Sequence, residues 1–206
     1  YDSAHPQRYG LDGATLPRYE VVPLRGSDTK PDAGQDPAAR QLIRDHRVWV
    51  ADQKLREAMA NQLPTPNGQK YVGTKQCGSC HQDDLQRWQN SKHAHAWETL
   101  ERAEADPKRY GWPVTKYPDC VGCHVVGYRQ QSGFVNKEET ADLAGVGCEQ
   151  CHGPGEAHSK DPKTKMGRVG GGTPSLVCAR CHDFEQSPDF LFGTRWPIIE
   201  HGKKLK

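Results

Sequence analysis

The sequence predicts a protein of short α-helices and loops with little or no β-sheet. It also predicts that bound non-protein groups contribute much of the apolar interior. Two observations carry this prediction. Only 34% of the 206 residues are hydrophobic, and the chain contains 21 Gly and 15 Pro, which is poor material for a conventional core. In addition, one five-residue cysteine and histidine motif occurs four times and uses all eight cysteines.

The repeated motif is Cys-x-x-Cys-His, the attachment signature of c-type haem. Two thiols three positions apart can each add to one vinyl group of a single porphyrin, and the following histidine is then held under the iron as its proximal ligand. The fold class is therefore a multihaem c-type cytochrome, with short helices and loops wrapped around four covalent haem c groups. The motifs are Cys77/Cys80/His81, Cys120/Cys123/His124, Cys148/Cys151/His152 and Cys178/Cys181/His182.

Zinc binding is the main alternative for paired cysteines, and a redox-active thiol pair is another. Neither requires a histidine directly after every second cysteine. Four complete repeats favour haem, and no thiol remains for a disulfide or a nucleophile.

The chain is predicted to have two parts. Residues 1–70 form an N-terminal arm and one helix, and residues 71–206 form the tetrahaem core. The helix begins with Asp36 as N-cap and Pro37 at its first position, and it runs to about Gln62, before Pro64. Residues 1–36 contain Pro6, Pro17, Pro23 and Pro31 and are expected to form an extended arm.

Within the core, the segment 83–106 is expected to form one helix or two short helices, with Ser91 as a cap of the second. His93 would share a helix face with Trp97 and Leu100. The segment 128–144 is expected to be a mostly polar loop or a short hairpin.

Charge and hydropathy argue against a nucleic-acid-binding protein and against a membrane-spanning helix. The formal charge is +2 before the haem propionates are counted, and no basic run indicates nucleic-acid binding. No apolar stretch has the length of a transmembrane helix. Because haem is attached to this motif outside the cytoplasmic membrane, we expect a periplasmic or extracellular protein whose signal peptide has been removed.

Four irons with a proximal histidine each need four further ligands to be six-coordinate. Of the two methionines, Met59 lies near the end of the predicted helix and Met166 in a Lys/Gly-rich loop, so bis-histidine haems of comparatively low potential are expected. His158 lies only six residues after His152, so it reaches a neighbouring haem more easily than that of its own motif. The candidates for the distal positions are His5, His46, His93, His95, His158 and His201.

The residues around the motifs resemble the tetrahaem cytochromes of the c-554 type over about residues 71–206. The resemblance lies in Cys77–His81 followed by Trp88 and the run Ser91–Ala96, in Asp119–Val125, and in Gly145–Gly155. It implies distal ligation by His93, His158 and His201. The chain departs from that family in its N-terminal extension and its additional histidines, so the fourth distal ligand is expected to be His46, with His5 and then His95 as reserves.

The arm and full coordination also resemble the extracellular tetrahaem cytochrome filaments of the OmcE type. This resemblance implies electron transfer along a row of haems in a head-to-tail polymer, an electron-conducting nanowire, and copies of the chain itself as partners. Two alternatives remain open. One is a soluble periplasmic electron shuttle that docks on redox partner proteins. The other is an enzyme that reduces small nitrogen or sulfur oxides at one open haem; in the electron-carrier interpretation the protein is not an enzyme and has no catalytic residue.

Overall fold

The computed structural model describes residues 36–106, 110–167, 173–183 and 186–202. The chain divides into two compact units, Tyr1–Ile43 and Arg44–Lys206. The predicted boundary between residues 70 and 71 stays a prediction. The N-terminal arm and His5 lie outside the described residues.

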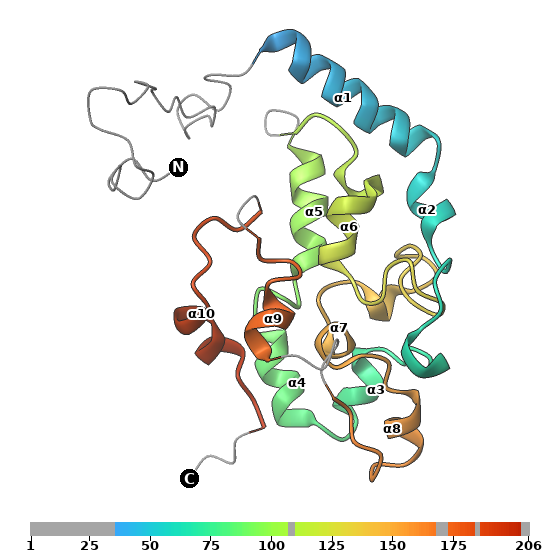
Figure 1. The fold of residues 1–206 in the computed structure, drawn as a ribbon, viewed down its shortest axis with the longest axis vertical. Helices are drawn as coiled ribbons and strands as arrows, with labels where there is room; N and C mark the ends of the chain where they lie inside the picture. Colours follow the sequence, from blue (N-terminus) through green and yellow to red (C-terminus); the bar gives the residue numbers. More distant parts are fainter. Residues whose placement is uncertain (1–35, 107–109, 168–172, 184–185, 203–206) are drawn as a thin grey trace, which may run out of the picture. The chain divides into compact units, whose positions relative to one another are not determined.

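The described chain consists of short helices joined by turns (Figure 1). No strand forms within these residues, where the pairing is limited to isolated bridges between Leu63 and Gln130 and between Val125 and Ala144. The helices, of which those marked η are 3-10 helices, are α1 Pro37–Asp52, α2 Leu55–Met59, η2 Pro66–Gly68, α3 Thr74–Gly78, α4 Gln82–Gln89, α5 Ala96–Ala105, η3 Val114–Lys116, α6 Pro118–His124, η4 Ala141–Leu143, α7 Cys148–His152, α8 Glu156–Lys160, α9 Pro174–Cys178 and α10 Phe192–Ile199.

The start of α1 agrees with the prediction, because the backbone N–H of Ala39 donates to the Asp36 side chain at 2.8 Å. The expected single helix to Gln62 is wrong. The chain breaks after Asp52, and Lys54 adopts a left-handed conformation (φ 52°, ψ 36°) before α2 begins. Helical periodicity continues across this position in the sequence, and a single left-handed residue is enough to redirect the axis.

Two other local expectations are also corrected. The segment after the first motif forms two helices, α4 and α5, but the residue at the N-cap position of α5 is His95 and not Ser91. The Ser91 hydroxyl instead donates to the Trp88 carbonyl, which closes the end of α4. His93 therefore lies in the turn before α5 and not on the face of a helix.

The segment 128–144 forms turns and not a hairpin, because its backbone bonds connect it to the surrounding loop. Phe134 N–H donates to the Val126 carbonyl and Val126 N–H to the Leu143 carbonyl. Phe134 is fully buried, 4.9 Å from the ring of Trp97. This loop, expected to be mostly polar, contributes a central residue of the apolar core.

Helices α5 and α6 pack against each other around an apolar core that is built from the protein's own side chains. It contains Trp97, Leu100, Trp112, Val114, Val121, Val125, Val126, Phe134 and Leu143. Val121 has no exposed surface and lies between Cys120 and Cys123. The second motif is therefore anchored through its middle residues.

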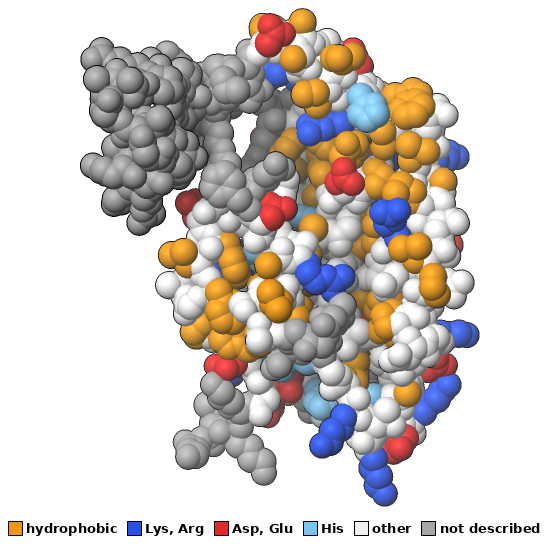
Figure 2. Space-filling model, viewed as in Figure 1, with side chains coloured by type: hydrophobic (Ala, Val, Ile, Leu, Met, Phe, Trp, Pro, Cys, Tyr) orange, Lys and Arg blue, Asp and Glu red, His pale blue; other side chains and the backbone are white. Residues whose placement is uncertain are grey.

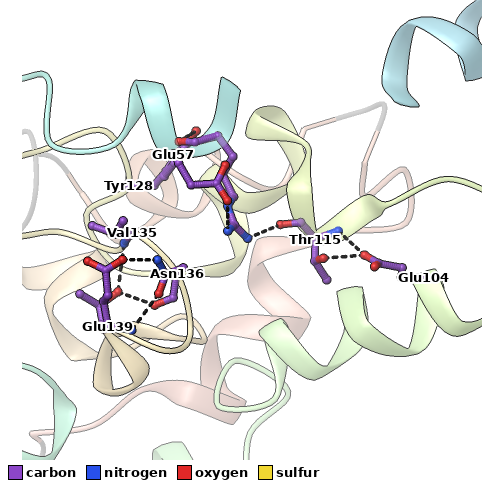
Figure 3. Close-up of polar contacts among 9 residues, drawn as sticks. Glu57, Glu104, Thr115, Tyr128, Val135, Asn136 and Glu139 are labelled. Atoms are coloured by element: carbon purple, nitrogen blue, oxygen red, sulfur yellow. Dashed lines mark hydrogen bonds and ion pairs between the residues drawn. The ribbon is translucent and has the colours of Figure 1, made fainter. Parts of the chain in front are cut away.

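A buried arginine joins α2 to this core. The guanidinium of Arg56 is 8% exposed, donates to the Thr115 carbonyl at 2.8 Å and pairs with Glu57. Thr115 in turn donates to Glu104 through its backbone N–H and its hydroxyl, as Figure 3 shows. The Tyr128 hydroxyl donates to the Arg56 carbonyl. These bonds connect α2, η3, α5 and the loop after α6.

Candidate haem-attachment sites

Each cysteine and histidine motif forms one helical turn. In α6 and α7 the whole motif is helical, with Pro118 at the start of α6. In the first and fourth motifs the assigned helices end earlier, but His81 N–H still donates to the Cys77 carbonyl at 3.0 Å and His182 N–H to the Cys178 carbonyl at 2.9 Å. Residues three and four apart lie on the same side of a helical turn, so each motif presents two thiols and one imidazole together.

The cysteines of different motifs lie close to one another. The side chain of Cys77 lies close to that of Cys148, and the side chain of Cys123 lies close to that of Cys181. Burial and then the charge of Cys178 raise the pKa of Cys151, so Cys151 and Cys178 are also close. The motifs are therefore neighbours in the order first, third, fourth, second, which differs from their order in the sequence.

The close pairing of thiols and their burial change the acidity of these groups. Within each close pair the interaction lowers the pKa of one thiol, Cys148 or Cys123, and raises the pKa of its partner, Cys77 or Cys181. Burial raises the pKa of Cys120 to about 11 and also raises that of Cys151. None of the eight cysteines forms a disulfide, so all of them remain candidates for attachment to vinyl groups.

Three pairs of imidazole rings face each other across a gap. The ring centroids are 6.0 Å apart for His81 and His158, 6.0 Å for His93 and His182, and 5.7 Å for His152 and His201. A metal–imidazole bond of about 2 Å on each side of a central ion puts the two ring centroids roughly 6 Å apart. Each gap therefore fits one iron, and each pair joins a motif histidine to one of the predicted distal ligands.

Most of these rings are oriented by a bond from Nδ1. The acceptors are backbone carbonyls for His124 (Ala96, 2.6 Å), His152 (Gly167, 3.1 Å), His158 (Thr164, 2.7 Å) and His201 (Ile199, 2.9 Å), and the Nδ1 of His182 lies 3.0 Å from the Ser187 hydroxyl. A carbonyl only accepts, so at the four histidines that bond to carbonyls Nδ1 carries the proton, and Nε2 is the nitrogen that can bind a metal.

At the pair formed by His93 and His182, burial also favours the neutral, metal-binding form of the imidazoles. Burial lowers the pKa of both imidazoles, and at His93 the neighbouring His182 lowers it further. A lowered pKa keeps these rings neutral, which is the form that binds a metal.

The second motif differs from the other three. Among the described residues, no other histidine ring lies against His124. His46 lies on α1, where its ring stacks on Trp49 at 5.9 Å. His95 is exposed, and its Nδ1 lies 3.1 Å from Glu98. Arg47, the residue after His46, packs over the ring of Trp112 at 4.5 Å, and its charge reaches Cys120.

Apolar side chains lie at the surface near the fourth motif, where a porphyrin would contact them. Leu176 of α9, Leu191 just before α10 and Ile198 of α10 are 58–65% exposed. Figure 2 shows hydrophobic side chains gathered over this part of the chain. Together with the ring gaps, these surfaces fit haem, whereas the described residues contain no group of three or more His, Cys, Asp or Glu that would hold a zinc ion.

A polar cavity of about 550 Å³ lies away from the motifs. Its lining includes Arg56, Glu101, Glu104 and Lys137, and no residue of a motif. The acid and base groups of this cavity are therefore not part of an attachment site. No helix in the described part of the chain is both long and apolar enough to span a membrane.

Sequence reasoning missed two kinds of residue. The carbonyls that orient the imidazoles are invisible in a sequence, since every residue has one. Glu149 sits between the thiols of the third motif and is only 1% exposed. The sequence feature that could indicate its burial is the pair of nearby glycines, Gly147 and Gly155, because glycine allows other parts of the chain to approach closely.

Comparison with known proteins gives a consistent result. Residues 76–153, which include three of the four motifs, match the family described as "Cytochrome c554 and c-prime". A curated relative, cytochrome c-554 of Nitrosomonas europaea, is 40% identical over 94 residues, which are 41% of this chain and 39% of the relative. The matched segment thus spans well under half of that relative's length.

A solved structure, the reduced state of cytochrome c554 from Nitrosomonas europaea, is 28% identical with a TM-score of 0.39 and covers 65% of this chain and 79% of its own. The family match and the curated relative confirm the predicted cofactor, covalently bound haem c, and, with the helices and loops described above, the predicted fold class of a multihaem c-type cytochrome.

Proposed function

We propose that this protein is an electron carrier, not an enzyme, in which four covalent haem c groups are held by histidines. Bound haem iron supplies one-electron redox chemistry. The observation that carries the proposal is the three facing imidazole pairs, 81 with 158, 93 with 182, and 152 with 201. Two imidazoles on one iron leave no position for a substrate, so the chemistry that remains is electron exchange.

The chain's own residues have three tasks in this function. The eight cysteines anchor the porphyrins, and His81, His124, His152 and His182 provide the proximal ligands. His93, His158 and His201 provide distal ligands, and the carbonyls at their Nδ1 atoms hold several of these rings in place. Ligation by imidazole and not by methionine favours low reduction potentials.

The neighbouring thiols support a continuous row of haems. Cys77 lies beside Cys148, Cys151 is near Cys178, and Cys181 lies beside Cys123. The row would run from the first motif through the third and fourth to the second. Its two ends are then the haem at Cys77–His81 and the haem at Cys120–His124.

The fourth distal ligand belongs to the proposal as well. We assign it to His46, with His5 and then His95 as reserves. Support for His46 comes from Arg47, which packs on Trp112 and acts on Cys120 of the second motif. Residues 1–70 would then serve as an arm that completes the tetrahaem core of residues 71–206.

Spectroscopy of the purified holoprotein tests the ligand assignment. Low-spin ferric signals from every haem, and no carbon monoxide binding after reduction, are the expected results. Replacement of His46 by Ala should convert one haem to the high-spin form, whereas His95→Ala should not. High-spin iron at the haems of the first, third and fourth motifs in the native protein would overturn the proposal.

An open haem at the second motif is the basis of a second candidate, a reductase of small nitrogen or sulfur oxides. The observation that favours it is the absence of a second described imidazole beside His124. Such an enzyme needs acid and base groups aimed at the iron. Carbon monoxide binding to one haem of the reduced native protein, together with turnover of nitrite or sulfite, would favour this candidate over the electron carrier.

We further propose that the protein acts outside the cytoplasmic membrane and assembles head to tail into an electron-conducting filament. A soluble shuttle that docks on redox proteins is the alternative, and it uses the same haem chemistry. An arm that docks on a neighbouring copy propagates into a fibre unless the contacts close into a ring. Negative-stain microscopy of the native protein should show long threads; compact particles alone would favour the shuttle.

A further inference from the structure

A buried carboxylate lies inside the third attachment motif. Glu149 is 1% exposed, and its partners are backbone N–H groups. Val72 donates to both carboxylate oxygens at 3.0 and 3.1 Å, Gly73 donates at 2.8 Å and Gly155 at 2.6 Å. A buried charge is costly unless it is well hydrogen-bonded, and charge-assisted bonds of this kind are the strong ones.

These donors connect three parts of the chain that carry haem ligands. Val72 and Gly73 lead directly into α3, which holds Cys77 and is followed by His81. Gly155 leads directly into α8, which holds His158. One carboxylate on α7 therefore joins the segment before α3 to the segment before α8.

Further bonds hold the same two segments side by side. Lys70 N–H donates to the Glu156 carboxylate at 3.0 Å, and Glu156 N–H returns a bond to the Lys70 carbonyl at 3.3 Å. Ala157 N–H donates to the Gln69 side chain at 3.2 Å. The space around Glu149 is tight, since a Cβ on Gly155 would lie 3.2 Å from its Oε1. The carboxylate thus has little freedom to move.

The negative charge of Glu149 acts on its surroundings. Burial raises the pKa of Tyr71, and the charge of Glu149 raises it further. Glu149 lies between Cys148 and Cys151 of the third motif, and Gly73, the residue before α3, donates to it at 2.8 Å. The charge is therefore close to both the third and the first attachment motifs.

We propose that Glu149 is a positioning residue that holds His81 and His158 on opposite sides of one iron and whose charge lowers the reduction potential of that haem. The inference rests on the proposed function, because it takes the 6.0 Å gap between these rings as an iron site. A fixed negative charge near an iron stabilises the ferric form relative to the ferrous form, so its removal should raise the potential.

The test compares Glu149→Gln with wild-type holoprotein by redox titration and electron paramagnetic resonance. Glutamine has the same shape but no charge, and its amide NH₂ would face backbone N–H donors. We expect the midpoint potential of the haem at Cys77–His81 to rise, together with that of the haem at Cys148–His152, whose motif contains Glu149. Carbon monoxide should bind the haem at Cys77–His81 after reduction. Glu149→Asp keeps the charge but is one methylene shorter, so it should allow the added carbon monoxide binding with a smaller rise in potential.

Glu104→Gln is the matched control, because Glu104 also accepts two bonds, from the backbone N–H and hydroxyl of Thr115. It should leave all four potentials unchanged even if it lowers stability. Unchanged potentials and spectra in both Glu149 variants would overturn the inference. If neither variant accumulates with four thioether-bound haems, a general requirement for folding is the better account, and the inference also fails. A wild-type spectrum without low-spin bis-histidine haem would instead overturn the ligand assignment on which it rests.

Discussion

At the scale of single residues, the bond made by Nδ1 sets the tautomer of several candidate ligands. His158 and His201 donate from Nδ1 to carbonyls, which leaves Nε2 as the nitrogen that can bind a metal, and each ring has a motif histidine about 6 Å away. His95 has a carboxylate at its Nδ1 and is exposed. Exposure does not distinguish His95 from His201, which is also exposed; the difference is that the ring of His201 lies 5.7 Å from that of His152.

Replacement of His158 by Met tests the pair with His81. A methionine ligand raises the potential of a c-type haem, so the haem at Cys77–His81 should titrate at a higher potential with both thioethers intact. Redox titration with mass spectrometry measures both quantities. His95→Met is the control and should not alter this haem; an unchanged potential in His158→Met would contradict the pairing.

Glu101 is expected to contribute a small pH-dependent stability. Its bond to Lys137, 2.6 Å long, is the main cause of a lowered pKa, and Trp97 donates a second bond at 2.8 Å. Because the folded pKa lies below the unfolded one, the stabilisation is present above the unfolded pKa and is lost as pH falls through the folded pKa. The pair is partly exposed, so the effect is below about 1 kcal/mol.

Thermal unfolding of wild type and Glu101→Gln measures this effect. The variant should unfold at a lower temperature than wild type at pH 7, and the difference should shrink at pH 3. Glu138→Gln removes the same charge at a neighbouring surface position and should show no such trend. A difference in unfolding temperature between wild type and Glu101→Gln that stays constant with pH would contradict a stabilising role for the Glu101 charge.

At the scale of elements, helices of five residues such as α3, α7 and α9 are too short to be stable alone. They depend on close contacts between turns. Gly133 is one such point, because a Cβ there would lie 1.8 Å from the Gly127 carbonyl oxygen. This contact sets the turn that buries Phe134 beneath α5 and α6.

Gly133→Ala should therefore destabilise the protein by about 3 kcal/mol, since backbone has to move to relieve the overlap. Gly193→Ala is the control: a Cβ at Gly193 meets nothing within 4 Å, and the residue lies inside α10. Alanine there should be neutral or stabilising by about 0.5–1 kcal/mol. Denaturant unfolding of both holoproteins measures the difference; equal stabilities would show that the turn can relax.

At the scale of the whole molecule, the proposed row of haems has the second motif at one end. Replacing Cys120 and Cys123 by Ala should therefore remove one haem and leave the low-spin signals of the other three. Replacing Cys148 and Cys151 should instead interrupt the row and separate the first haem from the fourth. Magnetic coupling between haems in the two variants distinguishes an end position from an internal one.

Much of the candidate site was predictable from the sequence because the chemistry of attachment is local. Thioether formation needs two thiols and a histidine within one helical turn, so Cys77, Cys80 and His81 identify a site without tertiary information. The break at Lys54 and the burial of Phe134 were not predictable. The burial of Phe134 depends on its contact with the distant ring of Trp97. After the break at Lys54, Arg56 of α2 bonds to the distant Thr115 carbonyl, which the sequence does not show.

The sequence by itself determined the kind of cofactor and predicted four attachment motifs with the histidine that follows each thiol pair, since these are properties of five consecutive residues. Only the tertiary structure decided which imidazoles face each other. His158 is six positions from His152, yet its ring faces His81, because α8 is held against the segment before α3. Two histidines on opposite sides of one iron come from different segments of the chain, and only packing between those segments brings the two rings together.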